Sequence, residues 1–235
     1  MRSYRILTGV LLVAGAAAAG AVLSIPSAQV QTSAGAAAMQ APAASFPKDV
    51  FPESGSRLPG IPRADLDDAG KKLLDAKTPP DFFGPGAIRL YSLPVAEYMG
   101  AVNDYLRNKS GLDPKLVQLA ILVTAREFDS EYVWTAHEPQ GLKAGLPPEI
   151  IDVVKYRKPT KGLEEKDAAI IDMGREVLEQ HHVSSATFAR AQSLFGKQGV
   201  VNYASLIGDY AATTILLNTF DQHVRPADKA LLPIP

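Results

Sequence analysis

The sequence predicts an all-α protein whose folded part is a single, irregular helical bundle. Apolar residues recur at spacings of three and four along most of the chain, which is the period of amphipathic helices. There is no convincing strand alternation, and no Asn-Gly or Asp-Gly turn joins two apolar runs. A length of 235 residues is enough for one domain with a full core plus terminal extensions.

The N-terminus has the pattern of a secretory signal peptide. Arg2 and Arg5 precede an uncharged apolar run over 6–25, and small residues follow it. The run is long enough to be an uncleaved anchor, which is the alternative interpretation. Its high Ala and Gly content favours cleavage, because these residues partition weakly into lipid. We therefore predict a signal peptide over 1–28, export to the periplasm or the exterior, and no stable membrane span after cleavage.

Composition divides the rest of the chain into three parts. The segment 29–54 is rich in Ala, Gln and Pro and has little apolar bulk, so we expect a flexible leader. The predicted domain covers 55–225, and residues 226–235 are expected to form a C-terminal tail.

Helix boundary signals mark the first half of the domain. Asp65 is positioned to cap a helix that ends at the prolines of 78–80. Pro94 suits the first turn of a second helix, which Gly111 ends. This helix has an apolar stripe formed by Val95, Tyr98, Met99, Val102, Tyr105 and Leu106. The Asp113-Pro114 pair, a capping carboxylate followed by proline, predicts the start of a third helix.

The second half of the domain is marked in the same way. Ser130 is a candidate cap for the next helix, and Pro139 is expected to kink or shorten that helix. Gly145 suits its C-terminus, and Pro147-Pro148 suits the start of another helix.

The last part of the domain is predicted to contain three helices, over 164–180, 184–195 and 198–220, the last two separated by Gly196. The final helix is apolar nearly all round, so we expect it at the centre of the fold or in a subunit interface. Asp209 within it indicates a buried helix rather than a membrane span.

Composition and missing motifs exclude several function classes. The absence of cysteine excludes disulfides, thiolate metal sites, iron–sulfur clusters and thiol nucleophiles. The formal net charge is −1, and the Lys and Arg residues are scattered along the chain. No basic block suggests nucleic-acid binding. His137-Glu138 begins like a zinc-protease motif, but Gly141 stands where the second histidine is needed. We therefore expect no metal, no cofactor and no nucleic-acid partner.

The segment 126–137 concentrates groups that could perform chemistry. It combines His137 with the only tryptophan, Trp134, and with a tyrosine and several acids. On a helix Ser130, Val133 and His137 share one face. A neutral imidazole in an apolar pocket can act as a general acid or base near neutral pH. The alternative is a core histidine hydrogen-bonded to a backbone carbonyl.

This segment resembles the carboxymuconolactone decarboxylase family, which includes the alkylhydroperoxidase D-like proteins. The similarity rests on a Ser-x-Tyr-x-Trp-x-x-His pattern running from Ser130 to His137, followed by Gly145-Leu146. Further similar pieces are Arg57-Leu58-Pro59, Gly84-Pro85, Ser92-Leu93-Pro94 and the stretch from Gly208-Asp209-Tyr210 to Leu217-Asn218. The resemblance covers about residues 55–225.

The resemblance implies an alkylhydroperoxidase D-like helical bundle that assembles as a homotrimer or homohexamer. Peroxidase-type members use a Cys-x-x-Cys pair, but Ser130 and Val133 occupy those positions here, so thiol peroxidase activity is not expected. Decarboxylase-type members perform acid–base chemistry on a small unsaturated lactone acid. The proton-handling glutamate found in many members nineteen residues before the histidine is replaced by Gln118.

Two functional hypotheses follow. The first is an acid–base enzyme, of decarboxylase or isomerase type, acting on a small organic acid or lactone. In it His137 is the acid or base, Glu131 or Glu127 is its partner, and Gln118 and Tyr132 are polar orienting groups. The predicted pocket residues are Ser130, Tyr132, Val133 and Trp134. The alternative is a non-catalytic oligomeric member that binds a small apolar ligand. A carboxylate within hydrogen-bond reach of His137 in a closed pocket would favour the enzyme.

Overall fold

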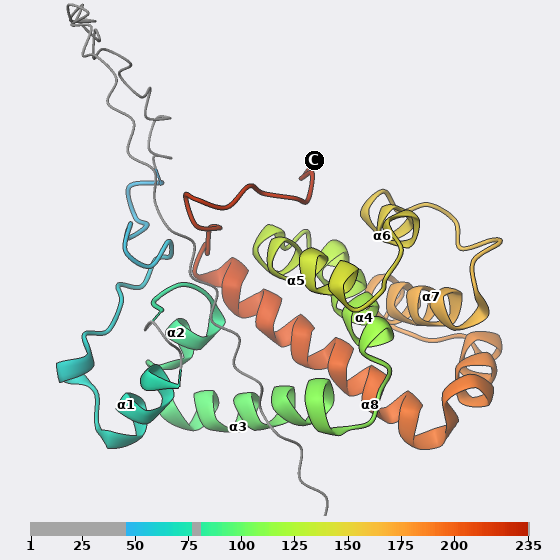
Figure 1. Ribbon diagram of the computed structural model, residues 1–235, viewed down its shortest axis with the longest axis horizontal. Coiled ribbons are helices and arrows are strands. Elements are labelled where there is room, and N and C mark those ends of the chain that lie inside the picture. Colours follow the sequence, from blue (N-terminus) through green and yellow to red (C-terminus); the bar gives the residue numbers. More distant parts are fainter. Residues whose placement is uncertain (1–45, 77–80, 235) are drawn as a thin grey trace, which may run out of the picture. The chain divides into compact units, whose positions relative to one another are not determined.

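The structure, a computed structural model, describes residues 46–76 and 81–234 (Figure 1). The predicted signal peptide and residues 29–45 of the leader lie outside the described residues. In the described ranges the chain is helical, with no strand and only one isolated β-bridge, between Phe51 and Ser56. The all-α prediction is therefore confirmed.

Eight α-helices follow one another along the described chain. A 3-10 turn at Arg63–Asp65 precedes the first of them, and a π-helical turn at Tyr105–Lys109 extends the third. The α-helices are α1 (Asp68–Asp75), α2 (Pro85–Arg89), α3 (Leu93–Asp104), α4 (Pro114–Glu127), α5 (Glu131–Lys143), α6 (Pro148–Lys155), α7 (Glu165–Glu179) and α8 (Ser185–Thr219).

Helix α4 is the centre of the domain. Every residue from Leu116 to Arg126 is buried, so the helix has no face toward solvent over most of its length. It packs against α5, α6, α7 and α8, and Figure 1 shows these helices grouped around it. As the sequence predicts, Asp113 caps the helix by accepting a hydrogen bond from the Lys115 amide at 2.9 Å.

The last helix is interrupted where the sequence predicts a break. Gly196 has a φ of 67°, a left-handed conformation that favours glycine, and it separates two helical parts of α8. By length and composition α8 could cross a membrane, but half of its most apolar window is buried inside the domain. Tyr203, Leu206 and Leu217 of its second part belong to the core. The helix is therefore built into the bundle.

Two local predictions are wrong. Helix α1 is capped by Asp67 rather than Asp65, because Asp67 Oδ1 accepts a hydrogen bond from the Gly70 amide at 2.8 Å. Helix α5 continues to Lys143 through Pro139. Pro139 lies on the exposed side of the helix, where water can satisfy a carbonyl that loses its amide partner.

The packed chain extends beyond the predicted domain bounds of 55–225 at both ends. Before residue 55, Val50 and Ser54 are buried, and the Gln222 side chain donates to the Ser54 carbonyl at 2.9 Å. After residue 225, Leu232 is buried and the Pro233 carbonyl accepts a hydrogen bond from Arg126 at 2.8 Å. Composition alone could not predict these contacts, because each joins residues that are far apart in the sequence.

Helix α3 has an unusual distribution of side chains. Most of its predicted apolar stripe is exposed: Tyr98 retains 69% of its surface, and Val95, Val102 and Tyr105 each retain more than 40%. The side turned toward the domain has small and polar residues instead, among them Ala96, Gly100 and Asn103, which line cavities. The stripe is thus not a core-facing surface of the single chain.

We predict that Gly174→Ala destabilises the domain, because α4 and α7 approach closely at this glycine. A Cβ at position 174 would lie 2.6 Å from Val123 Cγ1, so the helices must shift. The expected loss in the free energy of unfolding is about 1–3 kcal/mol. Gly208→Ala is the matched control: its Cβ would meet nothing within 4 Å, so we expect a gain of up to about 1 kcal/mol. Chemical denaturation measures both, and a Gly174→Ala protein as stable as the wild type would contradict this packing argument.

Candidate functional site

The candidate site is centred on His137, which three helices hold in place. The side chain projects from α5 and is 8% exposed. Its Nδ1 lies 2.9 Å from Gln118 Oε1 on α4, and its Nε2 lies 3.2 Å from the Tyr210 hydroxyl on α8. The hydrogen bonds at both ring nitrogens fix the orientation of the imidazole.

The partners of His137 define its tautomer. The amide oxygen of Gln118 can only accept, so the proton of the neutral imidazole is on Nδ1. The Tyr210 hydroxyl then donates to Nε2. The two rings meet edge to face, with centroids 5.2 Å apart and an interplanar angle of 88°. His137 thus serves as an acceptor that orients the Tyr210 hydroxyl.

Burial keeps His137 uncharged. Loss of solvation, assisted by the positive charge of Arg107, lowers the pKa of His137 to about 3. At neutral pH the imidazole therefore has no tendency to take a proton from water.

A cavity of about 190 Å³ opens beside the His137–Tyr210 pair. It lies between α2, α3, α5 and α8, and it presents two guanidinium groups, two amide or hydroxyl side chains and two tyrosines. The lining residues are Pro85, Arg89, Asn103, Arg107, Tyr132, Val133, Ala136, His137, Tyr210 and Thr213. The positive charges make the cavity suited to a small anion.

A buried carboxylate, Asp209, is connected to this cavity. Its Oδ2 accepts a hydrogen bond from Asn103 Nδ2 at 2.8 Å, and Asn103 also lowers the pKa of Tyr210. Its Oδ1 is buried and has no hydrogen-bond partner among the described residues. Burial raises the pKa of Asp209, against the opposing effects of Asn103, Arg89 and Arg107. Two hydrogen-bonded pairs, His137–Tyr210 and Asn103–Asp209, therefore contribute to this region.

The two glutamates expected to pair with His137 are elsewhere. Glu127 lies nine residues after Gln118 on α4, about 13 Å along the axis. There it forms ion pairs with Arg157 at 3.0 Å and Arg175 at 4.0 Å, and burial raises its pKa.

Glu131 does not reach the imidazole either. It lies six residues before His137 on α5, about 9 Å along the axis and on a different face. The expected glutamate–histidine pair is therefore wrong. Proximity in sequence suggested it, but the helical phase separates the groups.

The four predicted pocket residues divide into two pairs. Tyr132 and Val133 line the cavity. Ser130 and Trp134 do not: the Ser130 hydroxyl is buried without a hydrogen-bond partner in the described chain. The Trp134 side chain is fully buried, its indole N–H donates to Glu138, and Lys155 lies 5.5 Å from its ring centre. Trp134 is therefore part of the core rather than a wall of the site.

The backbone of Gly84 passes close to the hydroxyl of Tyr132. Gly84 has a φ of 85°, and a Cβ there would lie 2.2 Å from the Tyr132 hydroxyl. Burial raises the pKa of Tyr132 to about 12, so the phenol stays protonated.

Sequence reasoning missed most of the polar lining of the cavity. The missed lining residues are Arg89, Asn103, Arg107, Tyr210 and Thr213, and the carboxylate of Asp209 beside them was missed as well. One signal was available: Asp209-Tyr210 is a polar pair inside an otherwise apolar helix. Within 46–76 and 81–234, no three His, Asp or Glu side chains are arranged to share a metal ion.

We predict that His137→Gln removes a pH-dependent part of the stability. The folded pKa of about 3 lies below the unfolded value of about 6.5, so this group stabilises the fold above pH 6.5 and loses that effect as the pH falls toward 3. Between pH 7.5 and pH 5 the wild type should lose roughly 2 kcal/mol from this source. Urea titrations of both proteins at the two pH values isolate the effect. Equal pH dependence in the two proteins would refute it.

At neutral pH the same variant should lose about 1–3 kcal/mol of stability, because the substitution disrupts the hydrogen bonds to Gln118 and Tyr210. A variant that is as stable as the wild type at pH 7.5 would show that these bonds contribute little to folding.

Comparisons with known proteins support the fold and nothing finer. No family model and no curated protein sequence matches the chain. A solved structure does: an uncharacterised peroxidase-related protein from Ralstonia eutropha JMP134, described as an alkylhydroperoxidase AhpD core. The TM-score is 0.62 and the identity is 18%, over 72% of this chain and 92% of that one. The fold of this protein is thus AhpD-like.

Proposed function

We propose that the protein binds a small organic carboxylate in the cavity beside His137 and Tyr210, and performs acid–base chemistry of a decarboxylase or isomerase type on it. The observation that carries this proposal is the Tyr210 hydroxyl, which His137 orients at the wall of a cavity that also presents Arg89 and Arg107. A hydroxyl beside two cations is suited to an anionic substrate that must exchange a proton.

The two arginines provide the seat for the carboxylate. Arg89 Nη2 donates to Thr213 Oγ1 at 2.7 Å, which fixes the guanidinium at the cavity. Arg107 Nη2 donates to Gln140 at 3.0 Å, which orients the second guanidinium at the cavity. Guanidinium groups bind carboxylates through paired hydrogen bonds, so a ligand carboxylate can satisfy donors that the protein leaves free.

The proton step follows from the position of Tyr210. In a decarboxylation the bond to the carboxyl carbon breaks, CO2 leaves, and the electron pair remains on the substrate as a carbanion or enolate. Tyr210 then turns its O–H away from His137 Nε2 and gives the proton to that carbon, and water in the open cavity returns a proton to the phenolate. Burial raises the pKa of Tyr210, while Arg107 and Asn103 oppose this shift and stabilise the phenolate.

The second candidate function is ligand binding without catalysis. The criterion given by the sequence favours it: His137 Nδ1 is paired with the amide of Gln118 rather than with a carboxylate, and an amide cannot transfer a proton as a carboxylate does. In this case the same cavity would hold a small ligand on an oligomeric scaffold, and Tyr210 would serve only as a hydrogen-bonding group.

We also propose that the protein is a homotrimer or homohexamer. The exposed stripe of α3, formed by Val95, Tyr98, Val102 and Tyr105, supports an interface there, because contiguous apolar patches of this kind are uncommon on monomers. Light scattering of the purified protein should give a mass of three or six chains, and Tyr98→Asp should lower it. A stable monomer at micromolar concentration would remove the proposal. Glu97→Ala, on the same helix but outside the stripe, serves as the control.

The test of the acid–base role is Tyr210→Phe. We expect binding of small carboxylates to stay within about threefold of the wild type, because the arginines remain. Turnover should fall by about 100-fold or more, the contribution of one positioned proton donor. The measurement is CO2 release, or incorporation of solvent deuterium, over a panel of small keto and lactone acids.

Tyr203→Phe is the matched control, since Tyr203 lies on the same helix and packs against Phe195 outside the cavity. Unchanged turnover in Tyr210→Phe would contradict the acid–base role. Binding without turnover of any acid in the wild type would favour the second candidate.

A further inference from the structure

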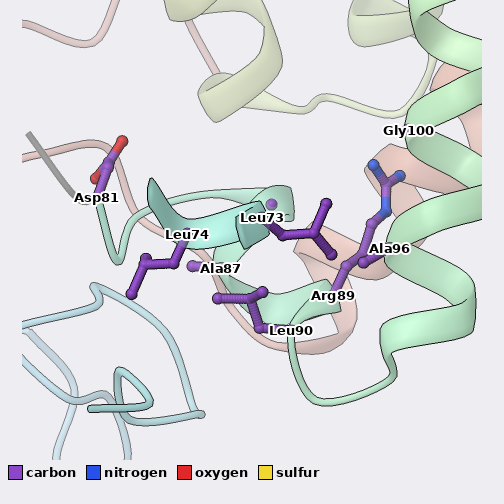
Figure 2. A pocket seen from close by; sticks show the side chains of 9 residues that line it. Leu73, Leu74, Asp81, Ala87, Arg89, Leu90, Ala96 and Gly100 are labelled. Atoms are coloured by element: carbon purple, nitrogen blue, oxygen red, sulfur yellow. The ribbon is translucent and has the colours of Figure 1, made fainter. Parts of the chain in front are cut away.

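A second cavity, of about 180 Å³, lies between α1, α2 and α3 (Figure 2). Its lining is mainly apolar, with Leu73 and Leu74 from α1 and Leu90 directly after α2. Figure 2 shows Leu73 extending toward Ala96 of α3, Leu74 extending the other way, and Leu90 below α1. The cavity is partly open to solvent, so a ligand can enter it.

Small residues on α3 create the room in this cavity. Ala96 and Gly100 lie four residues apart, on the same side of the helix. A Cβ built at Gly100 would meet nothing within 4 Å, so the space beside it is not filled by the protein. Glycine in a helix interior is less stable than alanine, and Gly100 makes no close contact with another helix that would explain it.

Arg89 is common to the two cavities. It lines the apolar cavity and also the cavity that contains His137 and Tyr210. Figure 2 shows its side chain extending from α2 along α3, beside Ala96. Its guanidinium is bonded to Thr213, which lines the His137 cavity. An apolar space on one side of Arg89 therefore adjoins a cationic, polar space on the other.

We propose that the two cavities form one site for an amphipathic monocarboxylate, with the carboxylate on Arg89 and Arg107 and a hydrocarbon chain against Leu73, Leu74 and Leu90. The proposal rests on the carboxylate seat of the proposed function and names the substrate class. A dry protein cavity of about 150 Å³ holds benzene, so the apolar cavity has room for roughly six carbons. The class is therefore a medium-chain carboxylate rather than a compact polar acid.

The experiment is calorimetric titration of the full chain with acetate, butanoate, hexanoate and octanoate. Each methylene that enters the apolar cavity should tighten binding about fourfold, from the transfer free energy of a buried methylene. The gain should level off near octanoate, when the cavity is full. Acetate reports the carboxylate seat alone, because it has no chain to place.

Gly100→Leu is the test variant, since it fills the apolar cavity without disturbing a contact and improves helix propensity. We expect at least a tenfold loss of octanoate affinity and no change for acetate. Ala96→Leu fills the same space from one turn away and should act alike. Ala101→Leu is the control: it adds the same side chain to an exposed position next to Gly100 and should leave every affinity unchanged.

The outcomes separate the two proposals. Affinity that is independent of chain length, or octanoate binding that survives Gly100→Leu and Ala96→Leu, overturns the amphipathic site and leaves the carboxylate seat intact. If neither acetate nor any longer acid binds, the carboxylate site at Arg89 and Arg107 is wrong, and the amphipathic site is wrong with it. A steep chain-length dependence that both filling variants abolish supports the proposal.

Discussion

The fold depends on the complete burial of α4. A helix without an exposed face must be covered on all sides, and α5, α6, α7 and α8 provide that cover. The same burial favours uncharged polar side chains near the N-terminus of α4. Gln118 is enclosed with the helix, and an uncharged amide there avoids the cost of a desolvated carboxylate. The hydrogen bond from His137 to this amide is thus compatible with the core around it.

In the proposed site, this burial assigns anion binding and proton transfer to different groups. His137 is too strongly desolvated to hold a charge, so its contribution is to orient Tyr210. The charged groups of the cavity are Arg89 and Arg107, whose positive charges also act on the buried Asp209. In the proposed function, the groups that attract the anion and the group that gives the proton therefore come from different helices.

Local chemistry explains which features could be predicted from the sequence. The boundaries at Asp113, Gly145 and Gly196 depend on capping and on left-handed backbone, which a few neighbouring residues determine. His137 was identified because an unusual group of side chains surrounds it in sequence. Arg89 and Arg107 could not be found this way, because they reach the cavity only through the crossing of α2 and α3 with α8. The same limitation explains the wrong choice of Glu127, which is near His137 in sequence and distant in space.

The inward side of α3 has a consequence for how this protein can change over evolution. Most substitutions that reshape a binding site also disturb the core, so new specificity usually brings a loss of stability. Here Ala96 and Gly100 line a cavity, and a Cβ added at Gly100 meets no neighbour within 4 Å. In the proposed site, ligand preference can therefore change through substitutions on one helix while the bundle around α4 stays the same, so new specificity need not cost stability.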